Sequence, residues 1–412
     1  MKPPIWVDQP RGLNQMAERL LQFKSISVDT ESNSLHAYQE QVCLIQFSTT
    51  EEDYLLDPLA LTDLTLLAPI FDDPGIEKIF HAAEYDLICL RRDFHFQFAN
   101  MFDTMVAARI LGRQAVGLGS MLEAEFGIHA DKRFQRANWA QRPLPAAQLA
   151  YARLDTHFLL PLRNILRQEL AAASRLELAE QDFQRMAKIF SNGHGPELDP
   201  TAEAGSRPPS AARRSGVQPQ AGAEAAGASA VQEAEAPDGV WRISGIQDLS
   251  PRQVAILSEL VAYRNRQARA SNLPAFKVLS NQTLIAIAQA APASRPALES
   301  LDALSSYQFT RHASGLLDGV HKGLNAPPLR RPSTPRPDDR YLQRMEALRG
   351  WRKHMAQSLG VESDVILPRD LLYSLVDHNP QDIAGVEALL VDSPWRAAHY
   401  GPDILSILKS LR

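Results

Sequence analysis

The sequence has only two cysteines and no long uninterrupted apolar run. Cys43 and Cys89 each lie inside a short apolar stretch, which predicts buried, reduced thiols and gives no support for a disulfide or a metal site built on sulfur. No stretch reaches the roughly 18 consecutive apolar residues that span a bilayer, and residues 1–16 have no apolar core of the signal-peptide type. We therefore expect a cytoplasmic protein without membrane contact.

The chain also lacks a strong charge of either sign, with a net charge of -5 over 412 residues. Hydrophobic residues make up 45% and charged residues 22%, which is ordinary for globular protein and excludes disorder throughout. This length allows two or three domains. Residues 241–325 contain nine basic against five acidic residues, a local excess that suits an accessory phosphate-binding surface.

Residues 1–195 alternate strand and helix signals, which predicts an α/β domain with a mixed sheet. Two β-type runs separated by a polar stretch read as a hairpin, and a third run extends it. The predicted strands cover 25–29, 42–49, 53–57 and 77–80. The predicted helices cover 61–71, a segment ending at 92, 104–111, 118–126 and most of 145–189, with Gly112 and Gly127 as two of the helix ends.

Residues 196–240 change character, because they consist mainly of Ala, Gly, Pro, Ser and Gln with very few large apolar side chains. Such a segment cannot bury enough surface to offset its ordering entropy, so we expect a flexible, acidic linker. Beyond it the chain repeats: residue i aligns with residue i+88, as Tyr263-Arg264 does with Trp351-Arg352. The repeat predicts two small all-α domains, at 241–325 and 338–412, joined by a stiff Pro- and Arg-rich connector at 326–337.

The acidic residues of the first domain suggest a metal site. Asp29 and Glu31 end an apolar strand and lie two residues apart, so their side chains share one face and repel unless a cation joins them. A third acid follows the strand at 77–80, and Asp86 is preferred there over Glu84. Tyr151 and Asp155 lie four residues apart and share one helical face, which His157 does not. Four acids and a tyrosine suit two divalent metals that promote attack of water on a phosphodiester.

These residues resemble the tyrosine-type DEDD family of 3′-5′ exonucleases, and the surrounding motifs resemble the ribonuclease D branch. The matching segments are Asp29-Thr30-Glu31, Val42-Cys43-Leu44-Ile45-Gln46-Phe47, Phe102-Asp103-Thr104, Asp131-Lys132, Asn138-Trp139 and Arg142-Pro143-Leu144. The repeat resembles two tandem helicase-and-RNase-D C-terminal (HRDC) domains, with Tyr263-Arg264-Asn265 and Val278-Leu279-Ser280-Asn281 in the first copy. The second copy departs from this pattern at Ile366-Leu367-Pro368-Arg369.

The resemblance implies a ribonuclease H-like exonuclease domain that removes nucleotides one at a time from single-stranded RNA 3′ ends, with tRNA precursors as substrates. It implies that Asp29, Glu31 and Asp155 hold one metal, and that Asp29 also bridges to a second metal on which Asp86 acts. Tyr151 would orient the attacking water. Oxygen ligands favour Mg²⁺ or Mn²⁺ for both ions. No segment of the sequence indicates a stable protein partner.

Other residues have a structural and a functional interpretation. Lys132, Arg133 and Arg136, with Trp139 nearby, have the types suited to phosphate contact and base stacking, or they form a solvated face. In the first repeat, Arg264 and Lys277 either contact nucleic acid or belong to an exposed helix face without that function. By contrast, Asp103 is expected to cap a helix, His81 to fix a turn by a backbone hydrogen bond, and Tyr263 and Trp351 to belong to the core.

Two other functions fit the same residues. The metal site would cleave DNA as readily as RNA, so a 3′-5′ exodeoxyribonuclease is the first alternative, which a comparison of RNA and DNA oligomers would separate. The second is a non-catalytic nucleic-acid-binding scaffold. It is disfavoured because an inert domain is expected to have lost some of its carboxylates, and all of them are present here.

Overall fold

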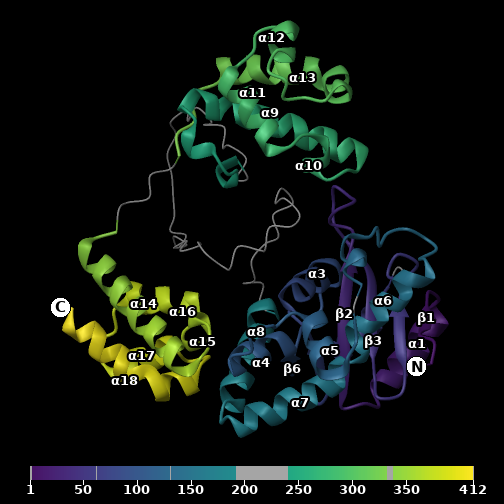
Figure 1. The fold of residues 1–412 in the computed structure, drawn as a ribbon, viewed down its shortest axis with the longest axis vertical. Coiled ribbons are helices and arrows are strands. Elements are labelled where there is room, and N and C mark those ends of the chain that lie inside the picture. Colours follow the sequence, from purple (N-terminus) through teal and green to yellow (C-terminus); the bar gives the residue numbers. More distant parts are fainter. Residues whose placement is uncertain (1, 62, 130, 192–239, 332–336, 412) are drawn as a thin grey trace, which may run out of the picture. The chain divides into compact units, whose positions relative to one another are not determined.

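The computed structural model describes residues 2–61, 63–129, 131–191, 240–331 and 337–411 (Figure 1). By their contacts these residues form two compact units. The first unit draws on the ranges Met1–Asn33, Gln41–Glu197 and Arg336–Arg412, and so combines the N-terminal α/β domain with the second repeat. The second unit draws on Ser34–Glu40 and Leu198–Pro335, and so contains the first repeat.

The α/β domain is built on one six-stranded mixed sheet. Its strands are β1 (Ile5–Val7), β2 (Ser25–Ser32), β3 (Val42–Ser48), β4 (Asp53–Leu56), β5 (Glu77–Phe80) and β6 (Met101–Asp103). They lie in the order β1-β4-β3-β2-β5-β6. The β2–β3 and β3–β4 pairs are antiparallel, and the other three pairs are parallel. The predicted mixed sheet and its opening hairpin are therefore confirmed.

Helices cover the sheet and complete the domain. They are α1 (Pro10–Leu20), η1 (Thr65–Leu67), α2 (Ala68–Asp72), α3 (Glu84–Phe94), α4 (Thr104–Leu111), α5 (Leu118–Phe126), η2 (Lys132–Arg136), α6 (Ala146–His157), α7 (Leu159–Ala172) and α8 (Leu176–Ser191). Gly112 and Gly127 end α4 and α5 with positive φ angles of 80° and 67°, as the sequence predicts. The helix predicted over 61–71 is wrong in its extent, since the described residues of this range form a 3₁₀ turn and the short α2.

One face of the sheet is unusually polar. The register places Asp29 opposite Gln46, and Ser48 opposite both Ser27 and Asp53, so these five side chains share a face. Helix α6 packs across β2, β3 and β4 on this face (Figure 1). Further along the same face, α7 contacts β2 and β5. The candidate site therefore lies where a strand edge, this polar face and α6 meet.

The two repeats fold as helical domains in the same register. The first contains η3 (Val240–Arg242), η4 (Ile246–Asp248), α9 (Pro251–Ser271), α10 (Ala275–Val278), α11 (Asn281–Ala290), α12 (Arg295–Glu299) and α13 (Ser306–Asn325). The second contains α14 (Asp339–Leu359), α15 (Ser363–Ile366), α16 (Arg369–His378), α17 (Ile383–Leu389) and α18 (Pro394–Ser410). Helices α9, α10 and α11 begin 88 residues before α14, α15 and α16, which confirms the predicted repeat.

The repeats differ where their sequences depart from each other. In the first, Ser280 caps α11 by accepting a hydrogen bond from the backbone N–H of Thr283 at 3.0 Å. In the second, the matching residue is Pro368, whose side chain cannot accept such a bond, and α16 begins without a side-chain cap. Tyr263 and Trp351 both pack against the cores of their domains at matching positions, as predicted.

Within the first unit, the second repeat is fixed to the α/β domain by a buried ion pair. The Arg396 guanidinium is fully buried and donates to both carboxylate oxygens of Asp182, at 2.5 and 2.9 Å. It also donates to the carbonyl oxygens of Val365 and Ile366, at 2.7 and 3.0 Å. The second repeat and α8 are therefore joined by a satisfied, desolvated contact.

Several expectations concern residues only partly covered by the structure. The predicted linker at 196–240 lies outside the described residues except for Val240, and the connector at 326–337 is described except for 332–336. The predicted boundaries therefore stay predictions. Cys43 and Cys89 are buried, reduced thiols, as predicted. Over the residues that the structure describes, we find no helix with the length and hydrophobicity that a bilayer-spanning segment needs.

Candidate active site

Strand β2 carries the first two acids to the polar face. Residues Ser25 to Ser27 of β2 pair with β5, and this pairing ends at Ser27. On its other edge, β2 stays paired with β3 at Asp29 and Glu31. Asp29 and Glu31 are partly exposed, in contrast to the buried apolar residues before them. The sequence places them together because residues two apart on a strand point the same way.

Helix α6 brings the fourth acid and the tyrosine to the same place. It starts after Pro145, whose ring excludes it from the helix interior, and it presents Tyr151 and Asp155 four residues apart on one face. A carboxylate oxygen from each of Asp29, Glu31 and Asp155 lies within 4.8 Å of the others. The Tyr151 hydroxyl hydrogen bonds to Asp155. Four of the five predicted residues therefore form one cluster.

Asp86 reaches the site from the other side of β2. Its Oδ1 accepts hydrogen bonds from the backbone N–H of Thr30, at 3.1 Å, and from the Thr30 hydroxyl. This edge of β2 is open to Asp86 because β5 has ended and the chain has turned into α3. Asp86 is buried, whereas Glu84 is exposed, so the geometry favours Asp86 for the third position. Thr30, between the two acids, is a site residue that sequence reasoning missed.

The turn that delivers Asp86 is held by Asp103. One carboxylate oxygen of Asp103 accepts from the backbone N–H groups of Met105 and Val106, at 2.8 and 2.9 Å, and so caps α4 as predicted. The same carboxylate accepts from the N–H groups of Ala82 and Ala83, at 3.2 and 2.7 Å. Ala82 has a positive φ of 61°, an unusual conformation for a residue with a Cβ, which these bonds help to maintain.

The expected backbone hydrogen bond from His81 is not what the structure shows. The ring Nδ1 lies 2.9 Å from the Thr104 hydroxyl, and this hydroxyl donates in turn to the carbonyl oxygen of Phe80. His81 therefore supports the turn through a side-chain partner. Its burial lowers the pKa of the imidazole, which favours the neutral ring.

Burial and mutual repulsion dominate the electrostatics of the site. Burial first, then the charge of Asp155, raises the pKa of Asp29 well above its ordinary value, and the same two effects act on Glu31 and Asp86 through their own acidic neighbours. Burial raises the pKa of Asp155 to about 8, opposed by the hydrogen bond from Tyr151 and assisted by the charge of Asp86. Such a cluster favours a bound cation, whose charge would offset the repulsion.

The environment of Tyr151 keeps its hydroxyl protonated. Burial first, then the charges of Asp155, Glu31 and Asp29, raises the pKa of the phenol far above its ordinary value. Its ring packs beside Phe134 and Trp139, with ring centroids 5.7 and 6.1 Å away. In the metal-free site the hydroxyl can therefore donate a hydrogen bond.

Two of the six residues considered for nucleic-acid contact are buried. Trp139 is 1% exposed and supports Tyr151, so its ring is not presented for base stacking. Arg264 is also 1% exposed and donates to Asn281 Oδ1 at 2.6 Å. Sequence reasoning took both as surface residues because burial of an arginine or a tryptophan depends on tertiary packing. These two expectations are corrected, and both residues have packing roles.

The other four candidates have less contact with the core. Arg133 is exposed and pairs with Asp131, and Arg136 and Lys277 are exposed. Lys132 lies in η2, although its side chain falls outside the described part of the chain. These positions are compatible with phosphate contact.

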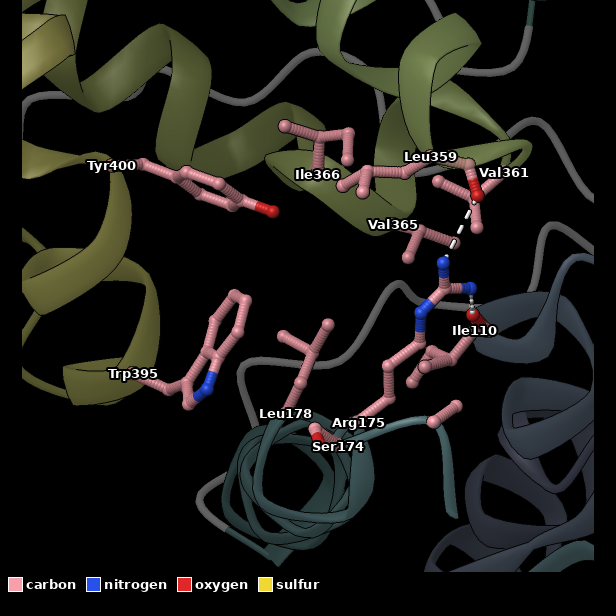
Figure 2. A pocket seen from close by; sticks show the side chains of 11 residues that line it. Ile110, Ser174, Arg175, Leu178, Leu359, Val361, Val365, Ile366, Trp395 and Tyr400 are labelled. Carbon is pink, nitrogen blue, oxygen red and sulfur yellow. Dashed lines mark hydrogen bonds between the residues drawn. The ribbon is translucent and has the colours of Figure 1, made fainter. Parts of the chain in front are cut away.

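A cavity elsewhere in the first unit is of a different kind (Figure 2). It measures about 170 Å³ and is lined mainly by apolar side chains of the α/β domain and the second repeat, including Leu178, Val365 and Trp395. Figure 2 shows Arg175 at its edge, where the guanidinium donates to the carbonyl oxygens of Ile110, at 2.7 Å, and Leu359, at 3.0 Å. No acidic residue lines it, so it belongs to the contact between these domains and not to the carboxylate site.

Comparisons with protein families agree with this geometry. A family model for 3′-5′ exonucleases matches residues 4–171, a range that contains all five predicted catalytic residues. The HRDC domain model matches twice, at residues 253–320 and 342–408. The two HRDC matches fall on the two helical repeats.

Individual relatives cover the chain to different extents. Ribonuclease D of Gluconacetobacter diazotrophicus is 28% identical over 320 residues, which are 77% of this chain and 71% of the relative. The exosome complex exonuclease RRP6 of Saccharomyces cerevisiae is 33% identical over 70% of this chain. The chain spans only 19–41% of the length of three RRP6-type relatives.

A solved structure matches nearly the whole chain. The structure of Escherichia coli RNase D, an exoribonuclease involved in structured RNA processing, covers 99% of both chains with a TM-score of 0.66 and 25% identity. The family matches, the relatives and this structure converge on one assignment. The chain belongs to the ribonuclease D-like DEDD 3′-5′ exonucleases and carries two HRDC domains.

Proposed function

We propose that this protein removes nucleotides one at a time from RNA 3′ ends by metal-dependent hydrolysis, with Asp29, Glu31, Asp86, Tyr151 and Asp155 as its catalytic residues. The observation that carries the proposal is the cluster of three carboxylates within 4.8 Å, next to a protonated tyrosine. Its position on a family-matched exonuclease domain supports nuclease chemistry over a purely structural acidic cluster.

The donor set fits two divalent cations. All the candidate ligand atoms are carboxylate oxygens, which favour Mg²⁺ or Mn²⁺ over Zn²⁺. Asp29, Glu31 and Asp155 would hold one ion, and Asp29 and Asp86 would hold the second. Once bound, the ions would lower the pKa of an attacking water and neutralise charge on the phosphate and the leaving oxygen.

The side chains have distinct tasks in this proposal. Asp155 accepts the hydrogen bond of Tyr151, so the phenol is fixed at the edge of the carboxylate cluster, where it can orient a water. Water attacks phosphorus, the bond to the preceding O3′ breaks, and that oxygen leaves as a hydroxyl. The products are a nucleoside 5′-monophosphate and a chain shortened by one nucleotide.

RNA is the proposed polymer because of the relatives. Ribonuclease D of G. diazotrophicus and the E. coli exoribonuclease both match most of this chain. We extend this to tRNA precursors as natural substrates, as the sequence resemblance implies, and to the cytoplasmic location expected from the sequence composition. The exposed basic residues Arg133, Arg136 and Lys277, together with Lys132, would contact phosphates.

A direct test compares matched single-stranded RNA and DNA oligomers labelled at the 3′ end. We expect labelled 5′-monophosphate to be released from RNA in Mg²⁺ or Mn²⁺, and release to stop when a chelator is added. Preferential release from DNA would replace the proposal with the exodeoxyribonuclease alternative. Tight RNA binding without any metal-dependent release would favour the non-catalytic scaffold.

A further inference from the structure

A buried ion-pair group lies under α6, on the far side of the helix from the candidate site. The Asp53 carboxylate accepts a hydrogen bond from Arg153 Nε at 2.6 Å, and His157 Nδ1 lies 2.9 and 3.0 Å from its two oxygens. Only 7% of the Asp53 side chain and 10% of the Arg153 side chain are exposed. This charged group is therefore largely removed from water and held by short contacts.

A hydroxyl pair extends the group to the centre of the sheet face. Ser48 Oγ donates to Asp53 Oδ1 at 2.7 Å and lies 2.7 Å from Thr156 Oγ1. Thr156 is the residue after the site carboxylate Asp155. Burial acts to raise the pKa of Asp53, but the hydrogen bonds from His157, Ser48 and Arg153 outweigh it and lower the pKa. Asp53 is therefore held in the charged form that best accepts these bonds.

The geometry of a helix relates this group to the site. Successive residues of an α-helix are rotated by about 100° about the helix axis. Arg153 and His157 therefore share one face of α6. Tyr151 and Asp155 share another face, roughly 160–200° away around the axis. Thr156 lies between these faces and against the sheet. Contacts at Asp53, on β4, therefore resist rotation of α6 about its axis, and that rotation decides where Tyr151 and Asp155 point.

We propose that Asp53, with its partners Arg153 and His157, is a positioning residue that sets the rotation of α6 and thereby aims Tyr151 and Asp155 at Asp29 and Glu31. This inference rests on the proposed function, because it assigns Asp53 to the support of the proposed catalytic residues. Asp53 touches neither substrate nor metal in this role. Outer residues that orient metal ligands commonly change metal affinity or activity by about 10–100-fold when replaced.

Asp53→Asn in the full chain tests this directly, because asparagine keeps the shape and removes the charge. We expect kcat on an RNA oligomer to fall by about 10–100-fold with little change in KM. We also expect binding of Mn²⁺ alone, measured by titration of the metal-free protein, to weaken by about tenfold or more. The metal titration needs no turnover, so it reports on the arrangement of the carboxylates.

Glu77→Gln is the matched control. Glu77 is on the same face of the sheet and pairs with Arg163 and Arg167 of α7, which carries no site residue. It should lower stability to a similar extent while leaving kcat and Mn²⁺ affinity near the parent values. Equal losses in both variants would show general destabilisation and overturn the positioning role.

A milder variant covers the case in which Asp53→Asn does not fold. His157→Ala removes one of the two ring or guanidinium partners of Asp53 from a half-buried position, so it should weaken Mn²⁺ binding and kcat in the same direction but less. Parent-like metal binding and kcat in the folded variants would overturn the inference. Asp155→Asn separates this failure from failure of the proposed site: full activity in that variant would overturn the site itself.

Discussion

At the scale of single residues, the site depends on side chains that do not themselves belong to the acidic cluster. Thr30 holds Asp86 by its backbone N–H and its hydroxyl, while its neighbours Asp29 and Glu31 point to the opposite face of β2. Trp139 and Phe134 pack against Tyr151 in a similar supporting way. The orientations of Asp86 and Tyr151 are therefore each supported by neighbouring side chains.

Thr30→Val tests the support of Asp86. Valine keeps the shape of threonine and its backbone N–H, but it removes the hydroxyl donor to Asp86. We expect kcat to fall by about tenfold, with KM for RNA nearly unchanged, in steady-state assays on a 3′-labelled oligomer. Thr30→Ser, which keeps the hydroxyl, should stay close to the parent. A parent-like kcat for Thr30→Val would show that this hydroxyl does not contribute to turnover.

The raised pKa of Asp155 predicts an unusual dependence of stability on pH. Between its ordinary value of 3.8 and about 8, the folded protein without metal holds a proton that the unfolded chain releases. Stability falls with rising pH wherever the folded state binds more protons. We therefore expect the Tm of the chelator-treated protein to decrease from pH 5 to pH 8.

Asp155→Asn provides the control for this pH dependence, since it cannot titrate. Its Tm should change less between pH 5 and pH 8 than that of the parent, measured under the same metal-free conditions. Added Mg²⁺ should raise the Tm of the parent more at pH 8 than at pH 5, because cation binding requires the deprotonated carboxylates. A steeper fall in Asp155→Asn than in the parent would contradict this account.

At the scale of secondary-structure elements, one aspartate joins two segments by hydrogen bonds. Asp103 caps α4 and also binds the Ala82–Ala83 turn that leads into α3, with four backbone N–H groups donating to its carboxylate. The placement of Asp86 on α3 therefore depends on a residue at the end of β6. This link joins β6, α3 and α4 near the site.

Asp103→Ala should be more destabilising than loss of an ordinary helix cap. We expect the free energy of unfolding to fall by roughly 2–4 kcal/mol. The helix cap is lost, and the backbone N–H groups of Ala82 and Ala83 lose their acceptor at the same time. Urea denaturation followed by circular dichroism measures this free energy. Asp382→Ala, which removes a cap with one N–H bond to Gly385 at 2.8 Å, should cost about 1 kcal/mol. A smaller loss for Asp103→Ala than for this control would contradict the dual role.

Several elements and site residues could be predicted because local periodicity determines them. Asp29 and Glu31 follow from the two-residue period of a strand, and Tyr151 and Asp155 from the four-residue spacing on a helix. Strands β1 and β6 were missed because three residues carry too little periodic signal. The contacts of Asp53 could not be predicted, because Arg153 and His157 lie 100 or more residues away in sequence.

At the scale of the whole molecule, the second HRDC domain packs against the exonuclease domain. The second domain shares a compact unit with the exonuclease domain, and Arg396 is fully buried against Asp182. Further ion pairs lie at the same contact, such as Arg109 with Asp364 at 2.6 Å and Lys188 with Asp392 at 2.5 Å. In these further pairs the basic partner comes from the exonuclease domain and the acidic partner from the HRDC domain, whereas the buried Arg396–Asp182 pair has the reverse arrangement.

Asp182→Ala should strongly destabilise this contact, because it leaves the Arg396 charge buried without its carboxylate partner. Losing one member of a buried pair typically costs about 3–5 kcal/mol. Lys188→Ala is the control, since the Lys188 and Asp392 side chains are 64% and 45% exposed, and it should cost less than about 1 kcal/mol. Chemical denaturation measures the free energy of unfolding of both variants. Equal losses would contradict a larger contribution from the buried pair.

Replacement of Asp29 tests whether the carboxylate cluster is the catalytic site of a 3′-5′ exonuclease. Parent and Asp29→Ala proteins are saturated with Mg²⁺ or Mn²⁺ and incubated with 3′-labelled RNA, and released 5′-monophosphate is quantified. We predict metal-dependent release by the parent and near-complete loss in the variant, with the fold and RNA binding retained. Substantial 3′ trimming by pure Asp29→Ala protein would contradict the account.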